Sequence, residues 1–239
     1  MKVTWYGESG FCIEAEGKRL LIDPYFSDAL GKKREDRHRL VPVSEEWLTA
    51  SYDYLLFTHC HIDHTDPETV ETLLAANPHL ILAGPRSSLQ LLPFAPLWAE
   101  LREGAEARFG PFRVTALPAI HSDRFALGYR VEVEGKTLYF SGDTALLSGL
   151  QERVPQKPDA AFLCFNAGVG KNMDEKDAVR LALVIRPGIV IPFHYGILPG
   201  GVEPGRFCQL LTEAGVPWYL PGYGETFELT DLLNAKKRG

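Results

Sequence analysis

Short apolar runs separated by glycine-containing turns dominate the first 24 residues of the chain. Runs of three to five β-branched, aromatic and aliphatic residues are typical of β-strands. Gly7, Gly10 and the Glu16-Gly17-Lys18 turn separate these runs, as turn residues do. We therefore expect a three-stranded meander with strands at 3–5, 11–15 and 20–22.

Further along, compact apolar runs alternate with stretches whose apolar positions recur every three or four residues, which predicts strands alternating with helices. One predicted helix begins at Asp66-Pro67, with Asp as the N-cap and Pro at the first helical position. Another begins at Asp174 and has an apolar face made by Ala178, Leu181, Ala182 and Ile185. The remaining helices are expected at 87–92 and 207–214, and the strands at 54–57, 79–83, 112–117, 126–132, 136–140, 160–165 and 188–193.

A meander followed by alternating strands and helices predicts an α/β (α+β) fold with sheet buried between helical layers. The chain shows no linker-like shift in composition and no repeat, so we expect one domain over residues 1–239. Residues 25–50 lack this order. Their charge run at 31–39 predicts a solvated loop, with a lid that brings cations over an anionic substrate as the alternative. The tail from 235 to 239 is expected to fray.

Composition limits the classes of function. Hydrophobic residues make up 45% and charged residues 23% of the chain, as in ordinary soluble globular proteins. The net charge of -6 argues against a general electrostatic grip on nucleic acid. No apolar stretch approaches the roughly 18 residues of a membrane span, and the N-terminus does not resemble a signal peptide. The four scattered cysteines predict free thiols in a reducing cytoplasm.

The densest chemistry lies in the loop that joins the strand at 54–57 to the helix at Pro67. Its residues follow an H-x-H-x-D-H pattern made by His59, His61, Asp63 and His64. Side chains two apart in extended chain point the same way, so the first two histidines can hold one ion. Asp63 and His64 follow a turn and would face a second ion. Imidazole and carboxylate ligands suit Zn²⁺, Mn²⁺ or Fe²⁺, and three of the chain's seven histidines within six residues argue against an incidental polar loop.

Three more candidate ligands each follow an apolar strand: His121, Asp143 and His194. Any one of them alone would be weak evidence for a metal site, because histidines and aspartates at strand ends are common structural residues. Together with the loop they provide five histidines and two aspartates, enough for two ions with an open position between them, as metal-assisted hydrolysis requires. Asp23, after the third strand, is equally compatible with a turn and with a place behind a metal ligand.

This combination resembles the metallo-β-lactamase-fold hydrolases across nearly the whole chain. Within that family the sequence looks like the ascorbate-6-phosphate-lactonase-like branch. The features that support this branch are Trp5-Tyr6-Gly7, Gly10-Phe11, Ile22-Asp23-Pro24, Asn172-Met173 and Ile191-Pro192-Phe193-His194-Tyr195. The chain is shorter than the lactonase itself, so its substrate is not carried over.

The resemblance implies a four-layer αββα sandwich with two divalent ions, Zn or Mn, at one edge between the sheets. It assigns one ion to His59, His61 and His121. It assigns the other to Asp63, His64 and His194, with Asp143 as the bridge.

The expected activity is hydrolysis of a small ester, lactone or phosphoester by a metal-bridging hydroxide. Asp63 is expected to orient the nucleophile and to pass a proton to the leaving group. Asn166 and Tyr195 are candidates to bind substrate oxygens, and equally to stabilise their loops. Lys171 and Arg124 are candidates to hold an anionic substrate group. Cys60 is expected to point away from the ions, because a thiolate would break the nitrogen–oxygen ligand pattern.

Three alternatives stay open. The first is a phosphodiesterase or nuclease on the same scaffold, which the acidic balance disfavours. The second is di-iron redox chemistry, although His61 stands where the oxygen-reducing relatives carry glutamate. The third is a metal-holding scaffold without catalysis. We expect a small-molecule partner and neither nucleic acid nor membrane, and the oligomeric state is left open, a homo-oligomer included.

Overall fold

The computed structural model describes residues 1–167 and 172–235, and it contains two mixed β-sheets. The first sheet has the strand order β13-β1-β2-β3-β4-β5-β6, and the second has the order β12-β11-β10-β9-β8-β7. The first comprises β1 (Lys2–Trp5), β2 (Phe11–Ala15), β3 (Lys18–Ile22), β4 (Tyr54–Leu56), β5 (Ile81–Gly84), β6 (Trp98–Glu100) and β13 (Thr226–Glu228). The second comprises β7 (Glu106–Phe109), β8 (Phe112–Pro118), β9 (Leu127–Val133), β10 (Lys136–Phe140), β11 (Ala160–Cys164) and β12 (Ile189–Phe193).

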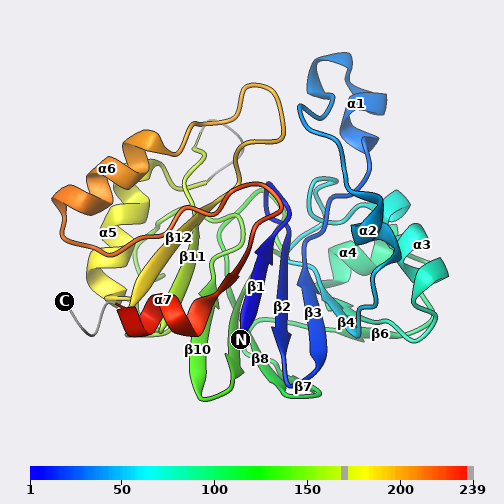
Figure 1. The fold of residues 1–239 in the computed structure, drawn as a ribbon, viewed down its shortest axis with the longest axis horizontal. Coiled ribbons are helices and arrows are strands. Elements are labelled where there is room, and N and C mark those ends of the chain that lie inside the picture. The colour runs from blue at the N-terminus through cyan, green and yellow to red at the C-terminus, as the bar shows by residue number, and fades with distance from the viewer. Residues whose placement is uncertain (168–171, 236–239) are drawn as a thin grey trace.

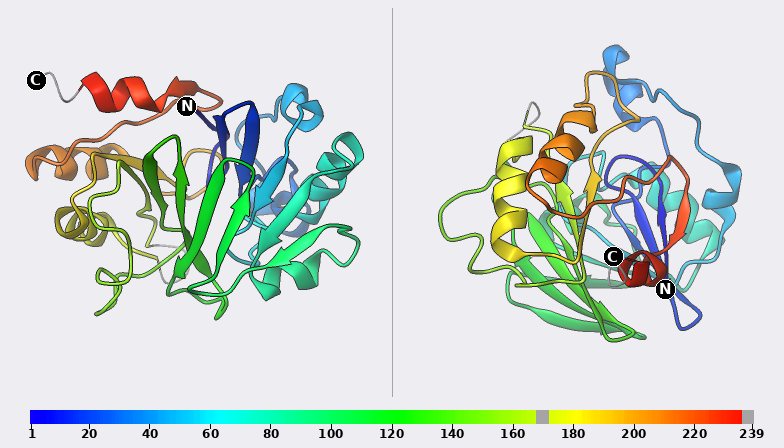
Figure 2. Two further views of the ribbon diagram at one scale, coloured as in Figure 1. Left: turned by 90° about the horizontal axis from the view of Figure 1, so that it is seen from below. Right: turned by 60° about the vertical axis from the view of Figure 1, so that its left-hand side comes forward.

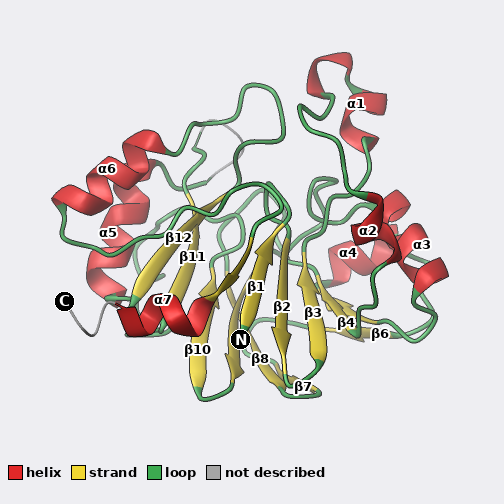
Figure 3. Cartoon of the chain, viewed as in Figure 1, coloured by secondary structure: helices red, strands yellow, loops and turns green. Residues whose placement is uncertain are grey.

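Helices cover the outer faces of the two sheets, so that the fold is an αββα sandwich (Figures 2 and 3). The helices beside the first sheet are α2 (Glu45–Thr49), α3 (Pro67–Ala76) and α4 (Arg86–Leu91), and those beside the second are α5 (Glu175–Ile185) and α6 (Gly205–Glu213). The C-terminal α7 (Leu229–Ala235) follows β13. The short α1 (Ala29–Lys33) and the 3₁₀ turn Glu35–Arg37 project beyond the sheets at one end (Figure 1). Within 1–167 and 172–235, no helix combines the length and apolarity that crossing a membrane requires.

Aromatic rings join the two sheets across the central core. Phe11 of the first sheet lies edge-on against Phe162 of the second, with ring centroids 4.9 Å apart, and Phe162 stacks on Phe140 at 4.0 Å. Such pairs add about 0.5–1.5 kcal/mol each beyond the area they bury. In β3, Leu20 and Ile22 face this core, while Leu21 faces the separate cluster beneath α3. The sheet is therefore apolar on both faces, which explains the continuous apolar runs in its strands.

Most of the predicted elements are confirmed, and the two predicted helix starts have the expected caps. The Asp66 side chain accepts a hydrogen bond from the Glu68 amide, and Asp174 accepts one from the Asp177 amide. The prediction missed β6, β7, β13 and α7. Residues 25–50, which the sequence left unassigned, contain α1, the 3₁₀ turn and α2, and the loop predicted at 31–39 includes the end of α1 and the 3₁₀ turn. Of the tail predicted to fray, residues 236–239 lie outside the described residues.

Candidate metal centre

Strand direction brings the candidate ligands to one edge of the sandwich. The strands β10, β11 and β12 run parallel, so the residues that follow them, Asp143, Asn166 and His194, emerge at the same edge. His121 follows β8, which runs in the same direction as β10 because both are antiparallel to β9. The loop after β4 reaches this edge from the first sheet. Segments far apart in sequence therefore meet without any long loop having to close.

The histidine loop is braced by its own backbone. The Thr65 amide donates to the carbonyl oxygen of His61 over 2.7 Å, and the Thr65 hydroxyl donates to that of His59 over 2.7 Å. The His64 amide also donates to the His61 carbonyl oxygen, over 3.0 Å. These hydrogen bonds form a turn between the extended residues that follow β4 and the first turn of α3. As a result, the four potential ligands of one short loop point inward.

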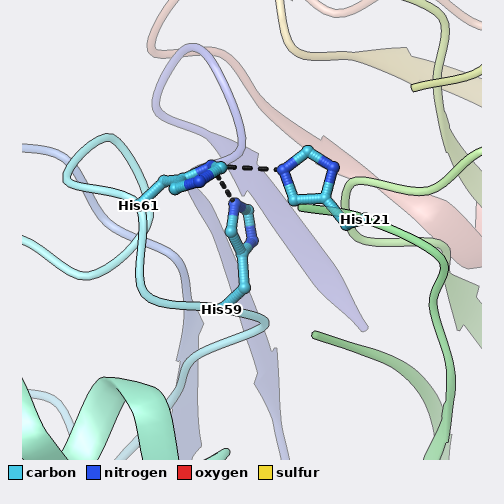
Figure 4. Close-up of side chains that lie close together, drawn as sticks. All are labelled: His59, His61 and His121. Carbon is cyan, nitrogen blue, oxygen red and sulfur yellow. Dashed lines mark hydrogen bonds between the residues drawn. The ribbon is translucent and has the colours of Figure 1, made fainter. Parts of the chain in front are cut away.

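One group of ligand atoms comes from His59, His61 and His121, whose rings point toward one another (Figure 4). The His61 Nδ1 atom lies 3.0 Å from His59 Nε2 and 3.1 Å from His121 Nε2. Three imidazoles that bind one zinc ion tetrahedrally at about 2.0–2.1 Å would place their nitrogens about 3.3 Å apart. The spacing therefore fits a shared ion closely.

A second group comes from Asp63, His64 and His194. The Nε2 atoms of the two histidines lie 3.2 Å apart, and Asp63 Oδ2 lies 3.8 Å from His194 Nε2. This group also offers three ligands, but a carboxylate oxygen replaces one of the three imidazole nitrogens of the first group.

Asp143 lies between the two groups. One carboxylate oxygen is 3.1 Å from His194 Nε2 and 4.0 Å from His121 Nε2, and the other is 3.6 Å from His64 Nε2. This second oxygen, Oδ1, is buried and has no hydrogen-bond partner among the described residues. A buried carboxylate oxygen without a donor is costly unless a cation or water satisfies it. The residues present thus fit two divalent ions with Asp143 in the bridging place.

The electrostatics of the metal-free site fit the same interpretation. Burial alone would raise the pKa of Asp143, but the facing His194 and His64 hold it well below its usual value. Burial would lower the pKa of His194, but Asp143 and Glu8 raise it to about 10. Burial, reinforced by the neighbouring His64, lowers the pKa of His59 well below its usual value. A proton on His194 therefore partly balances the carboxylates, and a metal ion would replace that proton.

Further polar residues hold the outward nitrogens of the ligand histidines. Asp23 lies 2.8 Å from His64 Nδ1 and also accepts from the Thr58 amide. Asn166 Nδ2 lies 2.7 Å from His194 Nδ1. Asp23 can accept from His64 Nδ1, so it orients that ring and keeps its Nε2 available for the metal, whereas Asn166 holds the His194 ring by a contact at Nδ1. The open question about Asp23 is thereby answered, since it lies directly behind a candidate ligand.

Two residues at the centre, Asn172 and Glu8, were not among the site residues predicted from the sequence. Asn172 donates through Nδ2 to Asp143 Oδ2 over 2.7 Å and to Asn166 Oδ1 over 2.8 Å. Glu8 is buried, and burial raises the pKa of its carboxyl to about 7. Its Oε2 lies 3.6 Å from His194 Nδ1. Glu8 has a φ of 44° and His194 a φ of 71°, left-handed conformations that are uncommon outside glycine and concentrate at functional sites.

The residues predicted to bind substrate lie in different surroundings. Asn166 lines the cavity above the ligands while holding His194. Tyr195 donates its hydroxyl to the Pro221 carbonyl oxygen and packs on Trp5, which is the loop-stabilising role that the sequence left open. Arg124 stacks on Phe125 beside a different cavity. Lys171 lies outside the described residues.

A cavity of about 260 Å³ opens above the ligands. His61, Asp63, His121, Asp143 and His194 reach it from below, together with Glu8 and Asn166. Its other wall comes from the charged stretch predicted to be solvated, because Arg34 and Arg37 line the cavity. The favoured prediction of a solvated loop holds for the exposed side chain of Arg34, whereas Arg37 is partly buried at the cavity, as the alternative of cations placed over the site expects. Which cations reach the cavity depends on how the stretch folds back over the edge, and no local pattern specifies this.

Comparison with known proteins agrees with this architecture. A family model described as "Beta-lactamase superfamily domain" matches residues 18–195. A "UPF0173 metal-dependent hydrolase" of Opitutus terrae is 29% identical over 245 residues, covering 96% of this chain and 100% of that protein. A protein of the same description from Staphylococcus haemolyticus is 27% identical and covers 95% and 100%. The structure of Igni18, a metallo hydrolase from the archaeon Ignicoccus hospitalis, shares the fold, with a TM-score of 0.76, 24% identity and coverage of 95% and 98%.

Proposed function

This chain belongs to the beta-lactamase superfamily domain family and is a metal-dependent hydrolase of that superfamily; we propose that it holds two divalent ions and cleaves a small ester, lactone or phosphoester. The observation that carries the proposal is Asp143, whose carboxylate lies between the two groups of histidines and whose buried Oδ1 has no hydrogen-bond partner among the described residues. Zinc or manganese suits this donor set. Two such ions, when bound, make water nucleophilic near neutral pH and take up negative charge that develops on oxygen.

The protein's own residues would divide the work by position. His59, His61 and His121 would hold one ion, and Asp63, His64 and His194 the other. Asp63 lies at the cavity and is partly exposed, so its carboxylate can accept a proton from the attacking water and later deliver it to the leaving group. The small cavity would exclude bulk water and hold the substrate against this carboxylate.

Lactones are included because of the lactonase-like sequence features. Trp5 packs on Tyr195, and Asn172 binds Asp143, so several residues of that pattern support the centre from behind. These contacts give residues of the pattern a structural role and define no substrate. The lactone is therefore one member of the proposed substrate class.

The test combines metal analysis with a panel of substrates. The purified protein should contain two divalent ions per chain and should hydrolyse at least one member of a panel of lactones, carboxylic esters and bis(p-nitrophenyl) phosphate. His61→Ala should abolish that turnover while leaving a folded protein. Full activity in a cleanly purified, metal-analysed His61→Ala protein would count against the assignment. RNA belongs in the panel, because its cleavage would instead favour the nuclease alternative.

A further inference from the structure

Two arginines face the candidate ligands from the opposite wall of the cavity. We propose that Arg37, assisted by Arg34, binds an anionic oxygen group of the substrate, a carboxylate or a phosphate monoester. The substrates would then be small esters or lactones that carry such a group on the acyl chain. This inference rests on the proposed hydrolase function and adds the substrate class.

The position of Arg37 is fixed relative to the ligands. We call residues 28–40, which contain α1 and the 3₁₀ turn, the rim segment. Arg37 Nη1 donates to the Pro199 carbonyl oxygen over 3.0 Å, and the Leu40 amide donates to the Ile197 carbonyl oxygen over 2.9 Å. Both acceptors lie in the loop that follows His194. The rim segment is therefore attached to the chain that carries a ligand, which holds the guanidinium above the centre.

Arg37 has hydrogen-bonding capacity to spare. A guanidinium presents five N–H donors in a planar fork that matches carboxylate and phosphate oxygens. Within the described part of the chain, the Arg37 side chain uses one of its nitrogens, on Pro199, and no carboxylate oxygen lies within salt-bridge distance. Its remaining donors are available to a ligand in the cavity that it lines.

Arg34 is held more loosely. It pairs with Asp36 over 2.9 and 3.2 Å, and both side chains are more than half exposed. Exposed pairs of this kind contribute little because water competes for both partners. Arg34 can therefore exchange Asp36 for a substrate anion at small cost, which suits an assisting role.

Neighbouring cations of the rim segment serve other purposes. Arg39 is used up by structure, because its guanidinium donates to the Tyr25 and Val41 carbonyl oxygens and to the Tyr223 hydroxyl. Lys33 is exposed and does not line the cavity. The two arginines thus differ in placement from cations close to them in sequence.

Charge and shape favour a small anion with a short carbon skeleton. Two divalent ions would bring four positive charges; the ligand carboxylates of Asp63 and Asp143 offset two of them, and Glu8 and Asp23 offset at most two more. With Arg34 and Arg37 on the opposite wall, the field in the cavity becomes positive and attracts anions. Leu30, Ile62 and Leu198 provide an apolar lining between the two charged regions. A volume of about 260 Å³ limits the occupant to a small molecule.

The first test measures binding and needs no turnover. Metal-loaded protein is titrated calorimetrically with methyl phosphate and with propionate, which separates the two sources of anionic oxygen. Arg37→Gln should weaken binding of the preferred anion by about tenfold or more, as expected for a lost charge-assisted contact. Arg34→Gln should weaken it by a smaller factor. Lys33→Gln is the matched control, since it removes the same charge nearby and should leave affinity unchanged. Metal content and thermal unfolding are measured for every variant.

The second test compares two esters of equal chain length, mono-4-nitrophenyl adipate and 4-nitrophenyl hexanoate, which differ in a terminal carboxylate. Wild-type protein should prefer the anionic ester, and Arg37→Gln should lose that preference through KM while hydrolysis of the neutral ester persists. Wild-type affinity for both anions in Arg37→Gln, or equal losses on both esters, would overturn the inference. Arginine-dependent anion binding without hydrolysis of either ester would keep the anion site and refute the ester as substrate.

Discussion

The floor and the rim of the cavity hold their functional side chains in opposite ways. On the floor, which comprises the seven candidate ligands, Asp143, His64 and His194 are almost completely buried and have polar partners behind them. On the rim segment, Arg34 lies between α1 and the 3₁₀ turn and is exposed, and Arg37 ends that turn and is partly exposed. Metal chemistry needs ligands held to a fraction of an ångström, whereas recognition of a charged group tolerates adjustment. The difference indicates that chemistry and selectivity can be changed separately in this protein.

The largest effect is expected from removing Asp143, the floor residue that lies between the two groups of candidate ligands. Asp143→Ala should lower kcat/KM on every substrate by about a thousandfold or more, because the two proposed ions would lose their shared ligand. Asp36→Ala makes the same chemical change on the rim segment and should change activity by no more than a few-fold. Steady-state kinetics on the anionic and neutral esters measure both. Comparable losses in the two variants would remove the distinction between floor and rim.

The pH dependence of metal binding should come from the floor alone. His194, with its pKa raised to about 10, is protonated at pH 7 in the metal-free protein. A metal ion must displace that proton, so apparent affinity should rise about tenfold per pH unit. Competition with a chelator between pH 6 and pH 8 measures this slope. A flat profile would show that His194 is not a ligand.

The raised pKa of His194 acts in the opposite direction on stability: as pH rises, metal affinity increases but the free energy of unfolding of the metal-free protein decreases. A histidine whose folded pKa exceeds its unfolded value stabilises the fold fully below the unfolded pKa and loses that contribution as pH rises through the folded pKa. His194 should therefore make metal-free protein less stable as pH rises from about 6.5 toward 10. Denaturant titrations of metal-free protein across this range test the sign.

A smaller effect, on metal affinity, is expected from Asp23, which lies behind the candidate ligand His64. Asp23→Asn keeps the shape of the side chain but removes the charge that orients His64, so metal affinity should fall by about 10–100-fold. Asp53→Asn is the matched control, since Asp53 pairs with Lys18 on the surface. Metal titrations of the two variants provide the comparison. Unchanged affinity in Asp23→Asn would mean that the contact only supports the fold.

The smallest effect is expected from loosening the rim segment. Asp28 accepts from the Arg39 amide over 2.9 Å and pairs with His38, which closes the segment on itself. Asp28→Asn should raise KM for the anionic ester a few-fold, because Arg34 and Arg37 lose part of their fixed position, and should leave metal content at the wild-type value. Loss of metal from this variant would show that the rim segment also supports the floor.

The residues that come together on the floor could be named from the sequence because their signals are local. His59, His61, Asp63 and His64 occupy one short loop, and His121, Asp143 and His194 each follow a recognisable strand. Parallel strand ends meet at one edge of a sheet, so these positions converge once the fold is known. The meander, the hairpin and the two capped helices were predictable for the same reason, since short-range patterns specify them.

The rim and the inner supports could not be found this way, because they depend on contacts between distant residues. Arg37 reaches the carbonyl of Pro199, 162 positions away, from a stretch with no apolar periodicity. Glu8 looks like an ordinary turn residue until the fold places it against His194. The short edge strand β6 and strand β13 likewise acquire strand structure only by pairing with β5 and β1.

The most direct test of the account is a crystal structure of metal-loaded protein with anomalous diffraction data collected at the absorption edge of the bound metal. The account predicts two peaks per chain about 3.5–4 Å apart, one beside His59, His61 and His121, the other beside Asp63, His64 and His194, with Asp143 touching both. A single peak, or peaks remote from Asp143, would contradict it.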